Sequence, residues 1–148
     1  MFTRVKTAQE IKDMRESGRM LAAVLKKIKE TVKPGMTGKD IAALCSAGLK
    51  TFGAKAAFYG YGGFPDVICI SPNDVIVHGI PNDTPFKDGD LVTFDFGVNY
   101  NGMITDSAFS MVIGKATKTQ QKLLKATERS MYAGIEQMVP GNRLHDIG

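Results

Sequence analysis

Two aspartates, Asp95 and Asp106, are the residues whose type and spacing point most clearly to chemistry in this 148-residue sequence. Each lies in a run of β-branched and aromatic residues that predicts a strand, at residues 91–98 and 103–113. Between the two runs, Asn101-Gly102 favours a hairpin with a two-residue type I′ turn. Because such a turn fixes the register of its strands, we expect both carboxylates on one face of a sheet.

The predicted register begins with Tyr100 opposite Met103. It places Gly97 opposite Asp106, and it makes the two aspartates diagonal neighbours, because Asp95 then lies opposite Ala108. Gly97 and Ala108 are small, so the register leaves space around both carboxylates. The other face of the first strand is apolar, and it must pack on helices; its residues are Val92, Phe94, Phe96 and Val98.

Two carboxylates this close repel each other unless a proton or a cation lies between them. Three interpretations are open from spacing alone. One aspartate could be exposed or paired with a lysine, with no functional role. The two could form an acid–base pair, although nothing else in the sequence indicates a glycosidase or an aspartic protease. They could also be ligands of one or two divalent metal ions, which favour hard oxygen donors.

His78 follows a short apolar run at residues 75–77 that predicts another strand. A lone histidine is more often a structural residue than a catalytic one, so its position alone assigns it no role. His145 has polar neighbours and is expected at the surface. The two cysteines, Cys45 and Cys69, lie in apolar segments and predict buried thiols in a reducing compartment rather than a disulfide framework.

Helices must support this sheet, and the sequence predicts two before it. The first begins at a capping box, Thr7 with Glu10, and ends at Pro34-Gly35; the second runs from Thr37 to Gly53. The segment 58–64 is rich in glycine and aromatic residues, which indicates a loop, and a strand is predicted at residues 67–71.

A third long helix, which begins at Thr117, repeats this opening. An offset of 106 residues aligns Pro34 with Pro140, Gly35 with Gly141, Asp40 with Asp146 and Ile41 with Ile147. These matches predict a diverged duplication. Residues 1–114 would form the first unit, and residues 115–148 would be the start of a second unit whose sheet is absent.

Composition excludes several classes. The apolar fraction of 43% and charged fraction of 23% are those of a globular protein. No stretch approaches the ~20 apolar residues of a membrane span, and the first six residues do not form a signal peptide. We therefore expect a cytoplasmic protein with no membrane partner. The net charge of +4 is spread over helices in which acidic residues also occur, which argues against binding to DNA.

Several motifs resemble the type I methionine aminopeptidases, and they occur in order along most of the chain. They are Gly60-Tyr61-Gly62-Gly63-Phe64-Pro65, the stretch 69–75, His78-Gly79-Ile80-Pro81, the stretch 88–92, Asp95, and the stretch 102–107. The resemblance implies an α+β protein with the pita-bread (creatinase/aminopeptidase-like) fold, here the first αβ half and the opening helix of the second. It also implies a metalloexopeptidase that removes the N-terminal methionine of peptides and nascent chains. The net charge of +4, and not the resemblance, makes a ribosomal surface a candidate partner through a weak attraction.

The resemblance also implies roles for individual residues. Asp95 and Asp106 match two of the five side chains that hold two divalent ions (Mn, Fe, Co or Zn) in the family. His78 matches the histidine that contacts the substrate, and Tyr61, Phe64 and Cys69 match positions lining the methionine pocket. The other ligands, a His and two Glu, belong to the family's second half. We therefore expect the chain alone to be inactive and prone to self-association through its uncovered sheet.

Departures from the family pattern are Pro72, Asp74 and the large Phe58. Two alternatives follow. The run around Asp95 also resembles Xaa-Pro aminopeptidases, although those carry a large additional domain before the pita-bread unit. A non-catalytic pita-bread binding protein, or a half-domain that pairs with another chain, is the second alternative. The loss of Asp95 or Asp106 would be expected in a protein without catalysis, and both are present.

Overall fold

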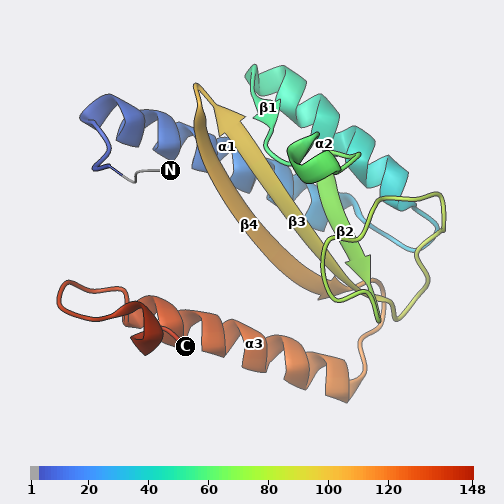
Figure 1. The fold of residues 1–148 in the computed structure, drawn as a ribbon. Helices are drawn as coiled ribbons and strands as arrows, with labels where there is room; N and C mark the ends of the chain where they lie inside the picture. The colour runs from blue at the N-terminus through green and yellow to red at the C-terminus, as the bar shows by residue number, and fades with distance from the viewer. Residues whose placement is uncertain (1–3) are drawn as a thin grey trace. The chain divides into compact units, whose positions relative to one another are not determined.

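The computed structural model describes residues 4–148, so the first three of the six N-terminal residues considered above lie outside the described part. The chain forms two compact units, one ending at Gly114 and one beginning at Lys115. The first contains α1 (Ala8–Thr31), α2 (Gly38–Phe52), β1 (Lys55–Ala56), η1 (Tyr61–Gly63), β2 (Ile68–Pro72), β3 (Leu91–Tyr100) and β4 (Met103–Val112) (Figure 1). The second contains α3 (Lys118–Glu136) and η2 (Leu144–Asp146).

Both predicted helix starts in the first unit are confirmed, and side chains fix them. The Thr7 hydroxyl accepts a hydrogen bond from the Glu10 backbone N–H (3.2 Å), and the Glu10 carboxylate accepts one from the Thr7 N–H (2.8 Å). Thr37 and Asp40 form the same reciprocal capping box at the start of α2. These contacts satisfy backbone N–H groups that a helix leaves without internal partners.

The sheet is antiparallel, and β3 lies at its centre. β1 and β2 pair with different parts of one edge of β3, and β4 pairs with the other edge along its whole length. One prediction was wrong: residues 75–77 form no strand, and all three side chains are exposed. The reason is a turn at Asn73, whose φ of 51° carries the chain away from β2. The short strand β1 was not predicted.

One face of the sheet packs on α1 and α2 and forms the core (Figure 1). Phe94 and Phe96 of β3 are fully buried there, which contributes about 1.5–3 kcal/mol for each side chain. Ser17 of α1 is also fully buried, because its hydroxyl donates to the Val98 carbonyl (3.0 Å) and lies 2.8 Å from the Thr105 hydroxyl. The helices therefore hold the hairpin from one side and leave the opposite face of the sheet open within this unit.

The second unit repeats details of the first. Thr117 and Gln120 form the predicted capping box of α3. At the positions aligned by the 106-residue offset, Gly35 and Gly141 both have positive φ values, of 89° and 100°. The Asp146 carboxylate accepts from the Arg143 N–H (2.7 Å), as the Asp40 carboxylate accepts from the Thr37 N–H (2.8 Å). Where a second helix was expected, the structure has the single 3-10 turn η2.

Within residues 4–148, none of the helices has the length and apolar character that crossing a bilayer requires.

Candidate metal centre

The β3–β4 hairpin has the predicted register. Tyr100 lies opposite Met103, and Asp95 lies opposite Ala108, so Asp106 and Asp95 are on one face of the sheet. Asn101 and Gly102 both have positive φ, 50° and 82°, as a type I′ turn requires. The turn thus determines which side of the sheet carries both carboxylates, and it is the open side.

The two carboxyl groups interact strongly. Burial first, and then the negative charge of Asp106 and a hydrogen bond between the two groups, raise the pKa of Asp95 to about 6. His78 opposes this shift. A pair that resists full ionisation binds either a proton or a cation between its oxygens, and hard divalent ions favour such oxygen donors. The pair therefore fits a metal ion.

A cavity of about 540 Å³ opens over this pair. It brings together every site residue that the sequence predicted. Its lining is Phe58, Tyr61, Gly62, Gly63, Phe64, Pro65, Cys69, His78, Ile80, Asp95 and Asp106. The volume is that of a site for a small molecule or one amino-acid side chain with its backbone, and the walls are mostly apolar.

The apolar wall consists of aromatic rings and a neutral thiol. Burial, followed by the charges of Asp95 and Asp106, raises the pKa of Cys69 to about 11, so the thiol stays protonated at neutral pH. Tyr61 lies in a turn with three glycines at positive φ, and its ring is 83% exposed, at the rim. Cys45 is buried in the core with a pKa of about 12 and does not line this cavity.

Gly97 makes room for Phe58, a contact that the sequence analysis missed. A Cβ atom on Gly97 would lie 2.7 Å from the Phe58 ring and 2.9 Å from the Ala57 Cβ. The Ala57 N–H donates to the Gly97 carbonyl (3.1 Å), which holds the two segments together. The signal in the sequence was the glycine itself, since a glycine inside a strand often marks a close approach of another segment.

His78 lines the cavity from a loop and has a left-handed backbone, with φ of 56°. This conformation costs a residue with a side chain about 1–2 kcal/mol, so surrounding contacts must hold it in place. Such backbone strain is concentrated at functional sites. His145, in the second unit, is largely exposed, as predicted, and its Nε2 lies 3.4 Å from the Asp146 carboxylate.

Asp95 and Asp106 do not complete a metal site by themselves. Within residues 4–148, no three His, Cys, Asp or Glu side chains lie close enough together to hold an ion. Two carboxylates leave most coordination positions of a divalent ion to water, which gives weak binding.

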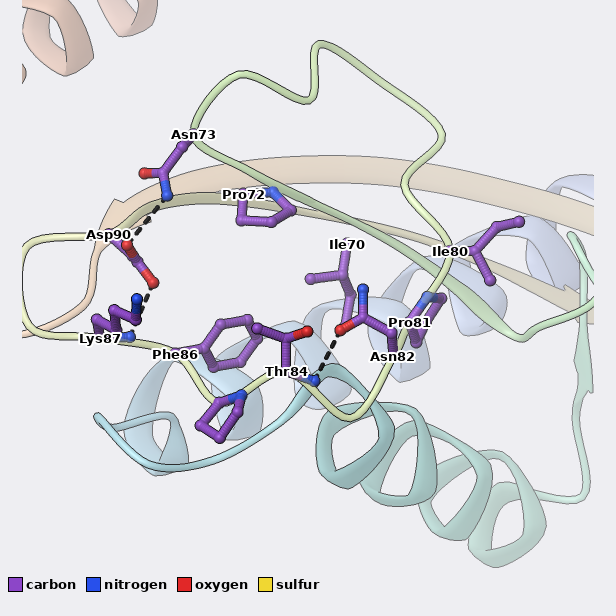
Figure 2. A pocket seen from close by; sticks show the side chains of 11 residues that line it. Ile70, Pro72, Asn73, Ile80, Pro81, Asn82, Thr84, Phe86, Lys87 and Asp90 are labelled. Carbon is purple, nitrogen blue, oxygen red and sulfur yellow. Dashed lines mark hydrogen bonds between the residues drawn. The ribbon is translucent and has the colours of Figure 1, made fainter.

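A smaller cavity of about 290 Å³ lies beside the loop that follows β2 (Figure 2). Three hydrogen bonds join its polar residues: the Asn73 amide donates to Asp90 (3.0 Å), Asp90 accepts from the Lys87 N–H (2.8 Å), and Asn82 accepts from the Thr84 N–H (2.8 Å). These contacts stabilise the loop.

Comparisons with known proteins agree with this geometry. Residues 12–148 match the family model described as metallopeptidase family M24. The chain is 39% identical over 142 residues to methionine aminopeptidase 1 of Bacillus subtilis, covering 96% of this chain and 57% of that protein. It is 37% identical over 150 residues to the methionine aminopeptidase of Salmonella typhimurium, covering 100% of this chain and 57% of that protein. The chain thus spans little more than half the length of these relatives.

Solved structures give the same result. The crystal structure of methionine aminopeptidase from Thermotoga maritima superposes with a TM-score of 0.94 at 33% identity, over 99% of this chain and 59% of that one. Prolidase from Pyrococcus furiosus superposes with a TM-score of 0.85 at 21% identity, over 97% of this chain and 41% of that one. The second likeness concerns the fold alone.

Proposed function

The chain belongs to metallopeptidase family M24, and on that basis we propose that it serves the metal-dependent removal of N-terminal methionine from peptides and nascent chains. Its resemblance to type I methionine aminopeptidases is confirmed, and so is its α+β, pita-bread fold class. The observation that carries the proposal is the pair Asp95 and Asp106, adjacent on an open sheet face at the base of an apolar cavity.

In this proposal Asp95 and Asp106 hold two divalent ions, of Mn, Fe, Co or Zn. Bound ions would supply Lewis acidity and a water of lowered pKa. The raised pKa of Asp95 supports the assignment, because it marks two carboxylates close enough to share a cation, and both line the cavity. Further ligands would come from residues with no counterpart in this chain, which spans 57% of its relatives.

The substrate would enter the cavity side chain first. Tyr61, Phe64 and Cys69 offer an aromatic and sulfur-containing surface, which suits the polarisable thioether of methionine. His78 would donate a hydrogen bond to the carbonyl oxygen of the scissile peptide as that oxygen gains negative charge. Attack of water forms the new C–O bond and the C–N bond breaks, while the proton that the water loses is transferred to the departing amine.

The setting of this reaction is also part of the proposal. Buried free thiols at Cys45 and Cys69 suit a reducing compartment, so we place the protein in the cytoplasm. Nascent chains are its substrates there, with a ribosomal surface as a candidate partner. Among residues 4–114 the outer edge of β4 has no strand partner, and unpaired edges favour self-association.

Two tests decide between this function and its rivals. The first assays the 148-residue chain itself on Met-Ala-Ser with added Mn, Co or Fe, while its metal content is measured. We expect weak metal binding and no release of methionine. Release of methionine by a chain that holds two tightly bound ions would contradict the proposed need for further ligands.

The second test uses a hybrid chain, in which residues 1–148 are joined to the part of the Bacillus subtilis relative that has no counterpart here. The hybrid should release methionine from Met-Ala-Ser and leave Ala-Pro-Ser intact. Cleavage of Ala-Pro-Ser instead would favour an Xaa-Pro peptidase. A folded hybrid that cleaves neither peptide would favour a non-catalytic binding protein.

A further inference from the structure

The loop that carries His78 is attached to the sheet at two places, first to the beginning of β3 and then to β2. It leaves β2 at Asn73, curves away from the sheet and comes back at Ile80 and Pro81, as Figure 2 shows. At its start, the Asn73 N–H donates to the Leu91 carbonyl (2.7 Å), and the Asn73 side chain accepts from the Leu91 N–H (3.1 Å). Its first residues are therefore fixed to the beginning of β3.

The second attachment directly follows His78. The Gly79 carbonyl accepts from the Ile70 N–H (2.8 Å), and the Gly79 N–H donates to the Ser71 hydroxyl (3.1 Å). The approach is so close that a Cβ atom on Gly79 would lie 2.1 Å from the Ile70 carbonyl oxygen. The Ser71 side chain thus binds the peptide group that joins His78 to Gly79.

Between these attachments little else holds the loop. Val75, Ile76 and Val77 are 43%, 88% and 62% exposed, so they contribute few packing contacts. His78 has to keep a left-handed backbone without support from its neighbours on the N-terminal side. The contacts at Gly79 are what remains to hold it.

We propose that Ser71 is a positioning residue for His78, holding the imidazole over the carboxylate pair through its hydrogen bond to the Gly79 N–H. Ser71 is 5% exposed and lies on the same sheet face as Cys69, whose partner across the strands is Asp95. Its hydroxyl therefore links the face that carries the aspartates to the loop that carries the histidine. The proposal rests on the proposed function of His78 as a hydrogen-bond donor to the substrate.

The test compares Ser71→Ala with Ser110→Ala in the hybrid chain. Ser110 is a matched control, because it is also a serine on the open sheet face, but its hydroxyl bonds to Thr93 (2.7 Å) and not to the loop. Ser71→Ala should lower kcat for Met-Ala-Ser at least tenfold and change KM less than threefold, since His78 acts as charge develops. Ser110→Ala should keep kcat within twofold, and Ser71→Thr, which retains the hydroxyl, should restore most of kcat.

A second measurement, amide hydrogen exchange at Gly79 in the 148-residue chain, needs no activity. It should become at least tenfold faster in Ser71→Ala and stay unchanged in Ser110→Ala. An unchanged Gly79 exchange rate overturns the proposal, and so does a Ser71→Ala hybrid that melts at a lower temperature while it keeps the original kcat. If the unsubstituted hybrid releases no methionine, the proposed function fails, and the exchange rates alone still support or overturn the role of Ser71.

Discussion

At the scale of single residues, the unusual feature of the site is that the negative charges of Asp95 and Asp106 repel each other. Burial and Asp106 raise the pKa of Asp95 from its ordinary value of 3.8 to about 6, so ionisation of Asp95 is unfavourable in the folded chain. Asp90 is the opposite case: hydrogen bonds from the Lys87 N–H and the Asn73 amide hold its pKa below the usual range. The negative charge of Asp95 is thus destabilised by its surroundings, and that of Asp90 is stabilised.

This contrast predicts opposite effects of two Asp→Asn substitutions. A folded-state pKa above the unfolded one means that the folded chain loses stability as pH rises from about 4 to about 6. In the absence of metal, Asp95→Asn should therefore raise the free energy of unfolding at pH 7.5 by about 1 kcal/mol, a value that allows for screening of the charge by solvent. At pH 3.5 the substitution should have no effect. Asp90→Asn should lower it at pH 7.5. Urea denaturation at both pH values measures these free energies of unfolding. An Asp95→Asn chain that is less stable than the parent at pH 7.5 would contradict the unfavourable ionisation of Asp95.

A second prediction for a single residue concerns the side chain of His78. In the hybrid chain, His78→Ala should lower kcat by roughly 10²-fold, as for the loss of one hydrogen-bond donor to a developing oxyanion. Metal content and melting temperature should stay close to those of the parent, because the side chain contributes little to packing. Loss of the metals or of the fold would instead assign His78 a structural role.

Among helices and strands, the sequence predicted best what local contacts decide. Capping boxes at Thr7 and Thr37 and the Asn101-Gly102 turn use only residues close in the chain, and all three have the predicted form. The strand expected at residues 75–77 does not form, because the chain turns away from β2 at Asn73 and returns only at Gly79, through a contact that periodicity does not encode. The sequence indicated Phe58 only as a departure from the family pattern, because the position of its ring depends on a contact with Gly97 in a strand far away in the sequence.

The contact between β3 and the loop at Phe58 predicts a coupled pair of substitutions. Gly97→Ala places a methyl group 2.7 Å from the Phe58 ring, so it should destabilise the chain by about 1–3 kcal/mol through overpacking. In Phe58→Ala much of that penalty should disappear, because one of the two clashing groups is removed. A double-mutant cycle of unfolding free energies measures the coupling, and additive effects would show that the two residues act independently.

For the whole molecule, stability should be uneven between the two units. In α3 the sole buried residue is Gly134, and Leu123, Met131 and Ile135 are about half exposed. The first unit instead buries a cluster of side chains from α1, α2 and β3. Segments with few buried apolar contacts open at low free-energy cost.

We therefore predict that amides of α3 exchange at least a hundredfold faster than those of β3 in the 148-residue chain, and that limited proteolysis cuts first within residues 115–148. In the hybrid chain the same helix should become protected, because new partners would cover its apolar residues. Equal protection of α3 and β3 in the shorter chain would mean that α3 is packed more firmly than its exposure indicates.

The paired strands β3 and β4 also restrict how related sequences can diverge. Side chains alternate between the two faces of a strand. Whether the number of residues between Asp95 and Asp106 is even or odd therefore decides whether their carboxylates lie on the same face. Substitutions at residues 96–105 can accumulate while this parity is kept. A single-residue insertion or deletion within either strand moves one aspartate to the core face unless a bulge absorbs it. In an alignment of relatives, a one-residue gap in this stretch without a compensating bulge therefore marks a lineage that has lost the site, even where both aspartates are still present.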